Sequence, residues 1–233
     1  MKVGENLPLR AGDEVCYFLT PTQESRKAFD TVYEDDNVII IDKESGVNAE
    51  AVYSALSEKG ETYFVHRLDR NTEGLMVFAR TKEAYEELLL AFRDGRVEKI
   101  YNALVFGKMP KRHSREEAYL EKDAARAQVR VNAKKGEKIV TEYEVMEEGE
   151  GCSLLKITLH TGKTHQIRAH MAYLGHPVVG DNKYGDNAKN AALHAARQRL
   201  LAKEISLDCG GCLSYLRGRR FITEKTINFP KNA

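Results

Sequence analysis

The chain has 233 residues, of which 42% are hydrophobic and 30% are charged, and its formal net charge is +1. This balance is typical of a folded globular protein and excludes wholesale disorder, and the length allows one large domain or two small ones. No apolar run approaches the roughly 20 residues that a membrane helix needs. Because the net charge is near zero, any polyanionic ligand must be held by local basic patches.

The cysteines and the N-terminus both favour a cytoplasmic protein. Met1 to Asn6 lack the apolar core of a secretion signal. Only Cys209 and Cys212 form a Cys-x-x-Cys pair, and neither a second pair nor suitably spaced histidines follow, as a zinc ribbon would need. We therefore expect reduced thiols, no structural metal and no membrane segment.

In the first half of the chain, residues 1–25 are expected to form a short extended lead that is too short for a domain. The following segments predict two strands within residues 32–43, a helix over 50–58, a helix that Thr81 caps and Asp94-Gly95 ends, a strand over 97–106 and a linker over 107–117. Strands are thus grouped rather than alternating regularly with helices.

The second half continues this pattern. Alternation of apolar and polar residues predicts half-buried strands at 139–145 and 155–159, after a short strand at 129–131. The next predictions are a helix that Thr164 caps and Gly175 ends, and a helix over 187–199. Residues 200–207 could continue that helix or form a strand, and Ile205 and Leu207 favour a strand. A basic turn at 217–220 and a closing strand over 225–229 follow. Together they predict an α+β fold with a mixed, mostly antiparallel central sheet flanked by helices.

The stretch from Val65 to Phe78 carries an unusual loop. Apolar runs on either side predict two strands, and the loop between them holds a histidine, two arginines and the carboxylate of Asp69. Strands hold a connecting loop rigidly, and nearby cations favour the ionised form of a carboxylate. Taken alone, the pattern fits an active-site loop and a polar surface hairpin equally well.

A second dense stretch runs from His160 to Pro177. It is not a phosphate loop, since Ile157 stands where that motif needs a glycine. It is a poor metal site, because His165 and His170 are five residues apart, about 140° around a helix. A polyanion site at a helix N-terminus, with Lys163 and Arg168, and a solvated polar helix face both remain open.

Two of these segments resemble a known family. His66 to Gly74 and Thr161 to His170 resemble two signature motifs of the RluA-type pseudouridine synthases, and Gly175 to Gly185 continues the second. Val38 to Gly46 and Lys99 to Val105 are similar to two weaker motifs of that family. The resemblance covers residues 30–185, with the motifs in the expected order.

The resemblance implies an enzyme that isomerises specific uridines to pseudouridine in ribosomal or transfer RNA. Residues 26–233 would form a pseudouridine synthase catalytic fold with a central cleft, acting as a monomer without metal or cofactor. Residues 1–25, especially Leu9 to Leu19, look like the remnant of an S4-type RNA-binding domain. The flipped-out base would need an aromatic or apolar face, and the RNA backbone would need cations.

Residue roles follow from the matching motif positions. Asp69 matches the catalytic aspartate, Arg168 the arginine that pairs with it, and Tyr101 the tyrosine that packs against the target base. The substrate-binding residues expected around them are Arg67, Arg70, Thr72, Lys163, Thr164, His165 and Gln166. Backbone contacts are expected from residues 108–115, Arg126, Arg130 and residues 217–220.

The sequence also departs from the family pattern. Glu73 stands where a small residue is usual, which adds negative charge close to Asp69 and could narrow the range of RNA that fits. Lys43 is followed by Glu44 instead of proline. The family's Leu-His-Ala strand matches residues 193–195 literally, whereas residues 200–202 fit the spacing better.

Two rival functions remain at this point. The first is a non-catalytic RNA-binding protein on the same fold, against which the joint presence of Asp69, Tyr101 and Arg168 argues. The second is a metal-dependent hydrolase that uses the histidines, which would lose its activity on chelation.

Overall fold

The computed structural model describes residues 28–123, 128–149 and 151–229, so the expected extension 1–25 and Arg126 lie outside the described residues. The strands are β1 (Phe29–Glu34), β2 (Val38–Lys43), β3 (Tyr63–Phe64), β4 (Glu73–Ala79), β5 (Val97–Phe106), β6 (His113–Asp123), β7 (Gln128–Asn132), β8 (Glu137–Gly149), β9 (Cys152–Leu159), β10 (Leu200–Leu207) and β11 (Arg219–Ile222). The helices are α2 (Ala49–Ser57), α3 (Lys82–Arg93), α4 (Gln166–Tyr173) and α5 (Asn187–Ala192), with a 3-10 helix η2 (Gly211–Leu216).

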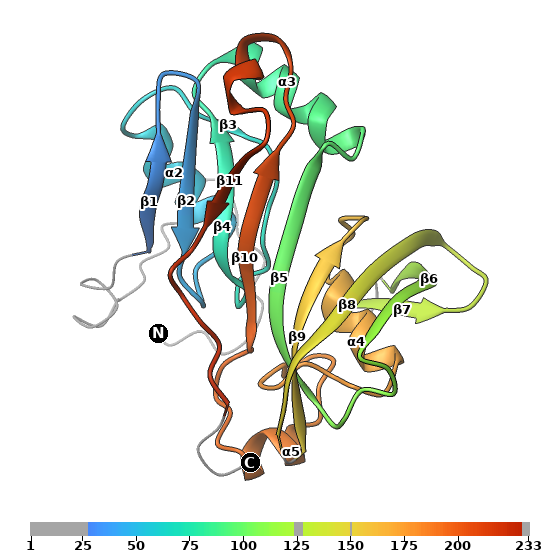
Figure 1. The fold of residues 1–233 in the computed structure, drawn as a ribbon. Helices are drawn as coiled ribbons and strands as arrows, with labels where there is room; N and C mark the ends of the chain where they lie inside the picture. The colour runs from blue at the N-terminus through green and yellow to red at the C-terminus, as the bar shows by residue number, and fades with distance from the viewer. Residues whose placement is uncertain (1–27, 124–127, 150, 230–233) are drawn as a thin grey trace, which may run out of the picture.

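All these strands belong to one sheet, in the order β1-β2-β4-β10-β5-β9-β8-β6-β7, with β3 paired to β4 and β11 to β10. Only β4 and β10 run parallel, and the other pairs are antiparallel. The α+β fold with a mixed, mostly antiparallel sheet is therefore confirmed. Figure 1 shows the sheet opening into two halves on either side of β5.

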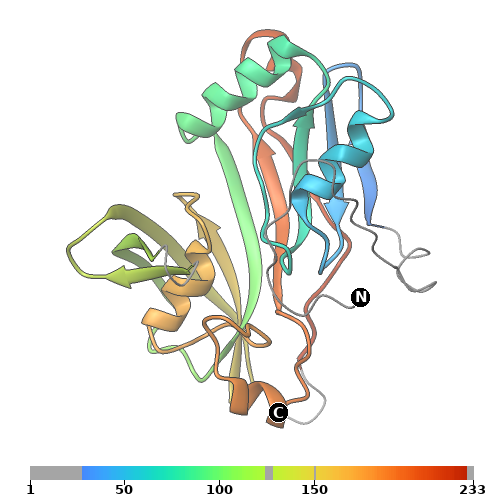
Figure 2. The ribbon, with the colours of Figure 1, turned by 180° about the vertical axis from the view of Figure 1, so that it is seen from behind.

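Helices cover the sheet unevenly. Seen from behind, α2 lies over one half and α4 over the other, on the same face (Figure 2). One core joins this face to α2 and α4, and a second joins the opposite face to α3 and η2. Residues 38–41 of β2 are buried on both faces, which explains their continuous apolar run.

Several predicted elements are confirmed. β5 has the predicted bounds, and the Thr81 hydroxyl accepts a hydrogen bond of 3.2 Å from the Ala84 amide at the start of α3. The open alternative near the C-terminus is settled, because residues 200–202 lie in β10 between β4 and β5. Leu193 instead follows the last residue of α5.

Other predictions are wrong. Residues 107–117 are not all linker, since β6 begins at His113. The inward positions Ser114, Ala118 and Leu120 alternate with mostly charged outward positions, so the strand pattern was not apparent in the sequence. The helix predicted over 187–199 stops at Ala192, and His194 turns the chain with a φ of 49°. Arg219 and Arg220 begin β11 instead of completing a turn.

The C-terminal strand predicted over 225–229 does not form. The Lys225 ammonium instead contacts the carboxylates of Asp42 and Glu44 at 2.8 and 2.7 Å, so side chains hold this segment against the sheet.

Cys209 and Cys212 are free thiols. Within the described residues, no helix has the length and apolar character needed to cross a membrane.

Candidate active site

The loop that carries Asp69 joins β3 to β4, and Lys43 holds it in place through a hydrogen bond to its backbone. The Lys43 ammonium is fully buried and donates hydrogen bonds of 2.9 to 3.1 Å to the carbonyls of Glu44, Val47 and Arg70. Burial lowers its pKa to about 8. The lysine of the weaker first motif therefore connects the turn after β2 to the Asp69 loop.

The end of the loop is equally constrained. Gly74 has a φ of 109°, and a Cβ there would lie 2.3 Å from the carbonyl oxygen of Ala202 in β10. Only glycine tolerates both the positive φ and the close approach of the neighbouring strand. The Thr72 amide donates to the Asp69 carbonyl at 3.1 Å, which closes the loop just before β4 begins.

Arg168, on α4, lies between two carboxylates. Its Nη1 donates to Asp69 Oδ2 at 2.7 Å, while Nε and Nη2 donate to the two oxygens of Asp181 at 2.7 and 3.0 Å. The Asp69 side chain keeps 23% of its surface exposed, whereas that of Asp181 is 0% exposed. Asp181 therefore anchors the guanidinium, and Asp69 presents its remaining surface to the outside.

Burial and pairing act in opposite directions on these groups. Burial alone would lower the pKa of Arg168, but the hydrogen bonds and charge of Asp181, and then of Asp69, outweigh it and raise that pKa. Burial would likewise raise the pKa of Asp181, but the Arg168 contact and the amides of Lys183 and Tyr184 lower it. Arg168 thus stays cationic beside an anionic Asp181.

His165 lies near the other carboxylate oxygen of Asp69. Its Nε2 lies 3.8 Å from Asp69 Oδ1, and its Nδ1 lies 2.8 Å from the Tyr184 hydroxyl, which accepts a hydrogen bond from the Val129 amide. Burial lowers the pKa of His165, and the opposing effect of the Asp69 charge is smaller. The neutral ring is therefore favoured. A proton donated by Tyr184 to Nδ1 would leave the Nε2 proton directed at Asp69.

Tyr101 supplies the aromatic wall. It lies in the middle of the sheet on β5, paired with Ala202 of β10 and Ile157 of β9, and is 8% exposed. Burial, with a contribution from the charge of Asp69, raises the pKa of Tyr101, so its hydroxyl stays protonated.

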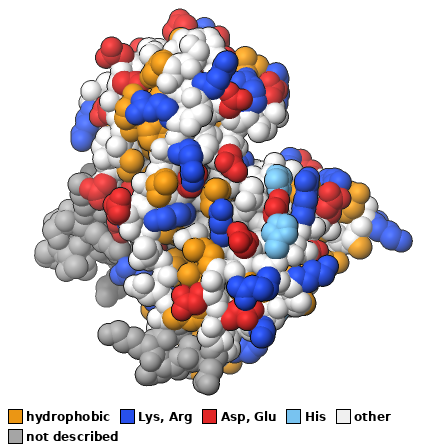
Figure 3. Space-filling model, viewed as in Figure 1, with side chains coloured by type: hydrophobic (Ala, Val, Ile, Leu, Met, Phe, Trp, Pro, Cys, Tyr) orange, Lys and Arg blue, Asp and Glu red, His pale blue; other side chains and the backbone are white. Residues whose placement is uncertain are grey.

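Asp69, Tyr101 and Arg168 line one cavity of about 430 Å³. In the space-filling view the outline of the molecule is notched between the α3 end of β5 and the half of the sheet that carries β6 to β9 (Figure 3). The other residues that line the cavity are His66, Arg67, Leu68, Thr72, Phe92, Arg93, Lys99, Leu159, Gly162, Lys163, His165, Gln166, Ile167 and Leu200.

Two of the predicted substrate-binding residues lie outside this lining. The Arg70 side chain turns back to the Gly46 carbonyl at 3.0 Å, and Thr164 precedes α4 without capping it. The N-cap position is instead His165, which has a φ of 52° and makes no side-chain cap, and the Gln166 side chain accepts from the Lys163 backbone amide. The predicted cap at Thr164 is therefore wrong.

The other predicted residues do reach the cavity. Arg67 pairs with Glu50 at 2.7 Å and Lys163 with Glu137 at 2.9 Å, both with substantial exposure. The Thr72 hydroxyl accepts a hydrogen bond of 2.9 Å from Nε2 of the Gln198 side chain. Gln166 is buried and also donates to the Val140 carbonyl, so it braces the loop before α4.

Glu73 does not line the cavity, contrary to the expectation that it would restrict the substrate. It begins β4 beside Leu201 of β10, and its charge opposes the lowering of the Lys43 pKa by burial. Burial raises the pKa of Glu73, while the charge of Lys225 opposes the rise.

Sequence reasoning missed the roles of Asp181, Tyr184 and Lys99. Asp181 and Tyr184 were visible as the continuation of the second motif, but nothing local indicated that they contact Arg168 and His165. Lys99 stands two residues before Tyr101, on the same face of β5.

The four histidines considered as metal ligands point to separate partners. His160 contacts Glu142, His165 contacts Tyr184, His170 contacts Thr141 and His176 contacts the Phe106 carbonyl. Across residues 28–123, 128–149 and 151–229, no group of three or more His, Cys, Asp or Glu side chains is placed to hold a metal ion.

Comparisons with known proteins place the chain in a family. The RNA pseudouridylate synthase family model matches residues 37–173, which is more than half of the chain. Ribosomal large subunit pseudouridine synthase D of Blochmanniella floridana is 36% identical over 173 residues, covering 67% of this chain and 54% of that protein. Ribosomal large subunit pseudouridine synthase C of Vibrio parahaemolyticus is 34% identical over 171 residues, covering 69% and 54%.

The chain thus spans about half the length of the curated relatives it matches. Among solved structures, Human RNA Pseudouridylate Synthase Domain Containing 1 aligns with a TM-score of 0.74 at 23% identity, covering 84% of this chain and 83% of the other. Human RNA Pseudouridylate Synthase Domain Containing 4 aligns with a TM-score of 0.67 at 20% identity, covering 83% and 87%. The structures support the fold, and the family match establishes that this chain belongs to the RNA pseudouridylate synthase family.

Proposed function

We propose that this protein isomerises uridine to pseudouridine in RNA, with ribosomal RNA as the first substrate to test. One observation carries the proposal: the ion pair of Asp69 and Arg168, 2.7 Å apart, lies in the same cavity as the buried ring of Tyr101. The names of the relatives from Blochmanniella floridana and Vibrio parahaemolyticus favour large-subunit ribosomal RNA over transfer RNA.

In the proposed reaction, Asp69 acts on the sugar of the target uridine, either by attacking it or by removing a proton. The glycosidic bond to N1 breaks, the base turns, and the base rejoins the sugar through C5, which loses its proton while N1 gains one. The product contains the same atoms as the substrate, so the reaction needs no second substrate. Arg168 holds the Asp69 carboxylate in place through its 2.7 Å hydrogen bond and offsets part of its charge.

The cavity suits a single flipped-out base. A base stacked in RNA cannot reach Asp69, so the nucleotide must leave the stack, and an aromatic face compensates part of that cost. Tyr101 offers such a face, with Leu68 and Ile167 as apolar neighbours in the lining. Arg67, Thr72, Lys163, His165 and Gln166 are retained as proposed substrate contacts, because all five line the same cavity.

Two residues are weaker substrate contacts in this proposal. Arg70 and Thr164 would need to reach RNA that extends beyond the cavity. We also propose that residues 26–233 form the catalytic domain and act as a monomer, since Asp69, Tyr101 and Arg168 all come from one chain.

The test is conversion of a natural substrate by the purified protein. Unmodified ribosomal and transfer RNA would be incubated with the protein, and pseudouridines would be mapped at single-nucleotide resolution. The proposal predicts new pseudouridine at one or a few fixed positions. Tight binding without any conversion would instead support the non-catalytic RNA-binding alternative, and loss of activity on chelation would support a metal-dependent enzyme.

A further inference from the structure

Lys99 is a cation inside the cleft without a carboxylate beside it. It lies on β5, and its ammonium lies 5.7 Å from the centre of the Phe92 ring. Among the described residues, no hydrogen bond or ion pair satisfies that ammonium. Burial lowers the pKa of Lys99, and burial together with the Lys99 charge also lowers the pKa of the neighbouring His66.

The other cations of the cleft are already paired. Arg67 contacts Glu50 at 2.7 Å, Arg93 contacts Asp94 at 3.0 Å, and Lys163 contacts Glu137 at 2.9 Å. These ion pairs are largely exposed, so each contributes little to stability. A partly buried and unpaired ammonium is more costly than an exposed one, and it marks a place where an anionic ligand would restore the lost interactions.

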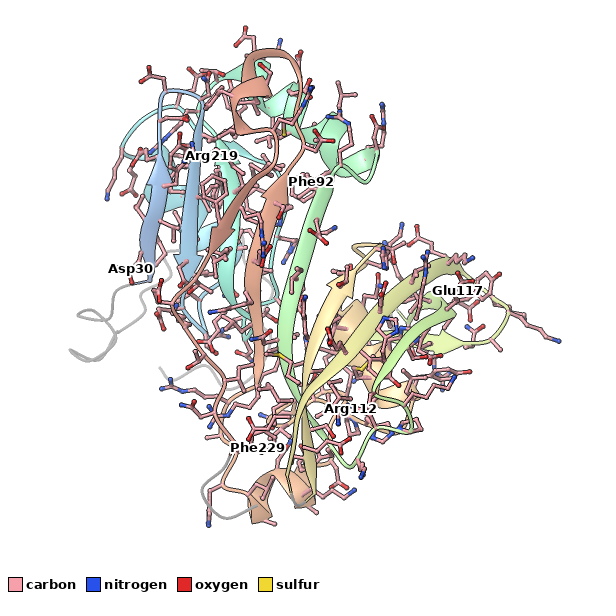
Figure 4. The ribbon with its side chains drawn as sticks, viewed as in Figure 1. Asp30, Phe92, Arg112, Glu117, Arg219 and Phe229 are labelled. Carbon is pink, nitrogen blue, oxygen red and sulfur yellow. The ribbon has the colours of Figure 1, made fainter. Side chains whose placement is uncertain are left out.

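Lys99 also lies where two cavities meet. A second cavity, of about 500 Å³, continues from the first between the end of α3 and the loop after β9. Figure 4 labels Phe92 on the α3 side of this passage. The residues that line both cavities are Phe92, Arg93, Lys99, Leu159, Gly162 and Lys163.

The wall opposite Lys99 leaves the ammonium accessible. Gly162 carries no side chain, and a Cβ built there would lie 3.4 Å from the Lys99 Nζ. Glu98 also lines the second cavity. It directly precedes Lys99 on β5, and because side chains alternate between the two faces of a strand, Glu98 lies on the opposite face from Lys99. The anion-binding character of the junction therefore comes from Lys99, with Arg93 and Lys163 at its sides.

We propose that Lys99 binds a phosphate of the RNA strand that flanks the target uridine, and that this strand continues from the first cavity into the second. The proposal rests on the proposed function, since it takes the base at Tyr101 as its reference. Two residues along a strand correspond to about 7 Å. Lys99 thus lies one such step from the base platform, where the backbone of a flipped-out nucleotide has to pass.

The first test is the salt dependence of RNA binding by Lys99→Met, Lys99→Arg and the control Lys156→Met. Lys156 is exposed on β9 and pairs with Asn102, so it lies on the opposite face of the sheet from Tyr101. A lost phosphate contact reduces the slope of log affinity against log salt by about 0.7 to 0.9. We expect this reduction in Lys99→Met alone, with KM raised about tenfold and kcat changed less.

The second test removes the charge from the RNA. A substrate with one neutral methylphosphonate linkage beside the target uridine should bind the wild-type protein as weakly as Lys99→Met binds normal RNA. The neutral linkage should cost Lys99→Met nothing further, because the two changes remove the same contact. Scanning the linkage over neighbouring positions would identify the phosphate.

Several outcomes would overturn the inference. An unchanged salt slope in Lys99→Met, an equal loss in Lys156→Met, or additive effects of the variant and the neutral linkage at every position would each do so. Unfolding midpoints would verify that Lys99→Met stays folded. If the wild-type protein makes pseudouridine and Lys99→Met matches it in salt slope and KM, only this inference is overturned. If the wild-type protein makes no pseudouridine, the proposed function is overturned.

Discussion

Asp181 is predicted to be the structural anchor of the active site, although Asp69 is its chemical centre. Replacing Asp181 by alanine would remove both bonds to Arg168, at 2.7 and 3.0 Å, and the acceptor of the Lys183 and Tyr184 amides. Leaving one member of a buried ion pair without its partner costs about 3–5 kcal/mol. We therefore expect Asp181→Ala to lower the free energy of unfolding by that amount.

Urea unfolding measures this cost. With an m-value of about 3 kcal/mol/M, the midpoint should fall by at least about 1 M with m unchanged. Asp94→Ala, which removes an exposed partner of Arg93, is the matched control and should leave the midpoint unchanged. Arg168→Met added to Asp181→Ala should recover much of the loss, because it removes a buried guanidinium that has lost Asp181 and keeps only the partly exposed Asp69 as a partner. A midpoint of Asp181→Ala equal to that of the control, or strictly additive effects, would refute this reasoning.

Three further variants test other parts of the site. Glu73→Gln should keep wild-type activity, since Glu73 lies outside the cavity; a changed substrate range would contradict this. Burial moves the pKa of Lys43 from 10.5 to about 8, so the unfolded chain binds more protons between these values. The unfolding free energy of the wild type minus that of Lys43→Met should therefore rise between about pH 8 and 10.5, and a flat difference would argue against a buried ammonium. Arg168→Lys should lose at least about tenfold in kcat, because one ammonium cannot reproduce bonds to both carboxylates; full activity would exclude a role for the bridging geometry.

The sequence predicts best where local patterns determine structure. The alternation within residues 139–145 and 155–159 indicated the two strands of the outer half of the sheet, and Thr81 marked the start of α3. The apolar runs around Asp69 located the strands that hold its loop. These features depend on residues close together in the chain.

The failures have tertiary causes. β6 pairs on both sides, with β7 and β8, so its ladder forms despite a highly charged sequence. The start of α4 depends on a left-handed His165 and on the buried Gln166 side chain, which local propensity would not favour. The role of Asp181 depends on a contact with Arg168 across 13 residues, which no periodicity encodes.

The motifs indicated the partners of the site but not their geometry. Asp69 and Arg168 are 99 residues apart in sequence, and their juxtaposition was expected only from the family resemblance. Which motif residues face the cavity could not be read from the motif itself. Thr72 and His165 line it, whereas Arg70 bonds to the Gly46 carbonyl and Thr164 is not part of the lining.

The most direct test of the account is Asp69→Asn, measured for both chemistry and binding with the same RNA. Asparagine keeps the size of the side chain and one oxygen for Arg168 but cannot act as nucleophile or base at the sugar. We predict that pseudouridine formation is abolished while RNA affinity stays within about threefold of wild type, since binding depends on the cavity and its cations. An Asp69→Asn variant that still forms pseudouridine at a comparable rate would contradict the central claim.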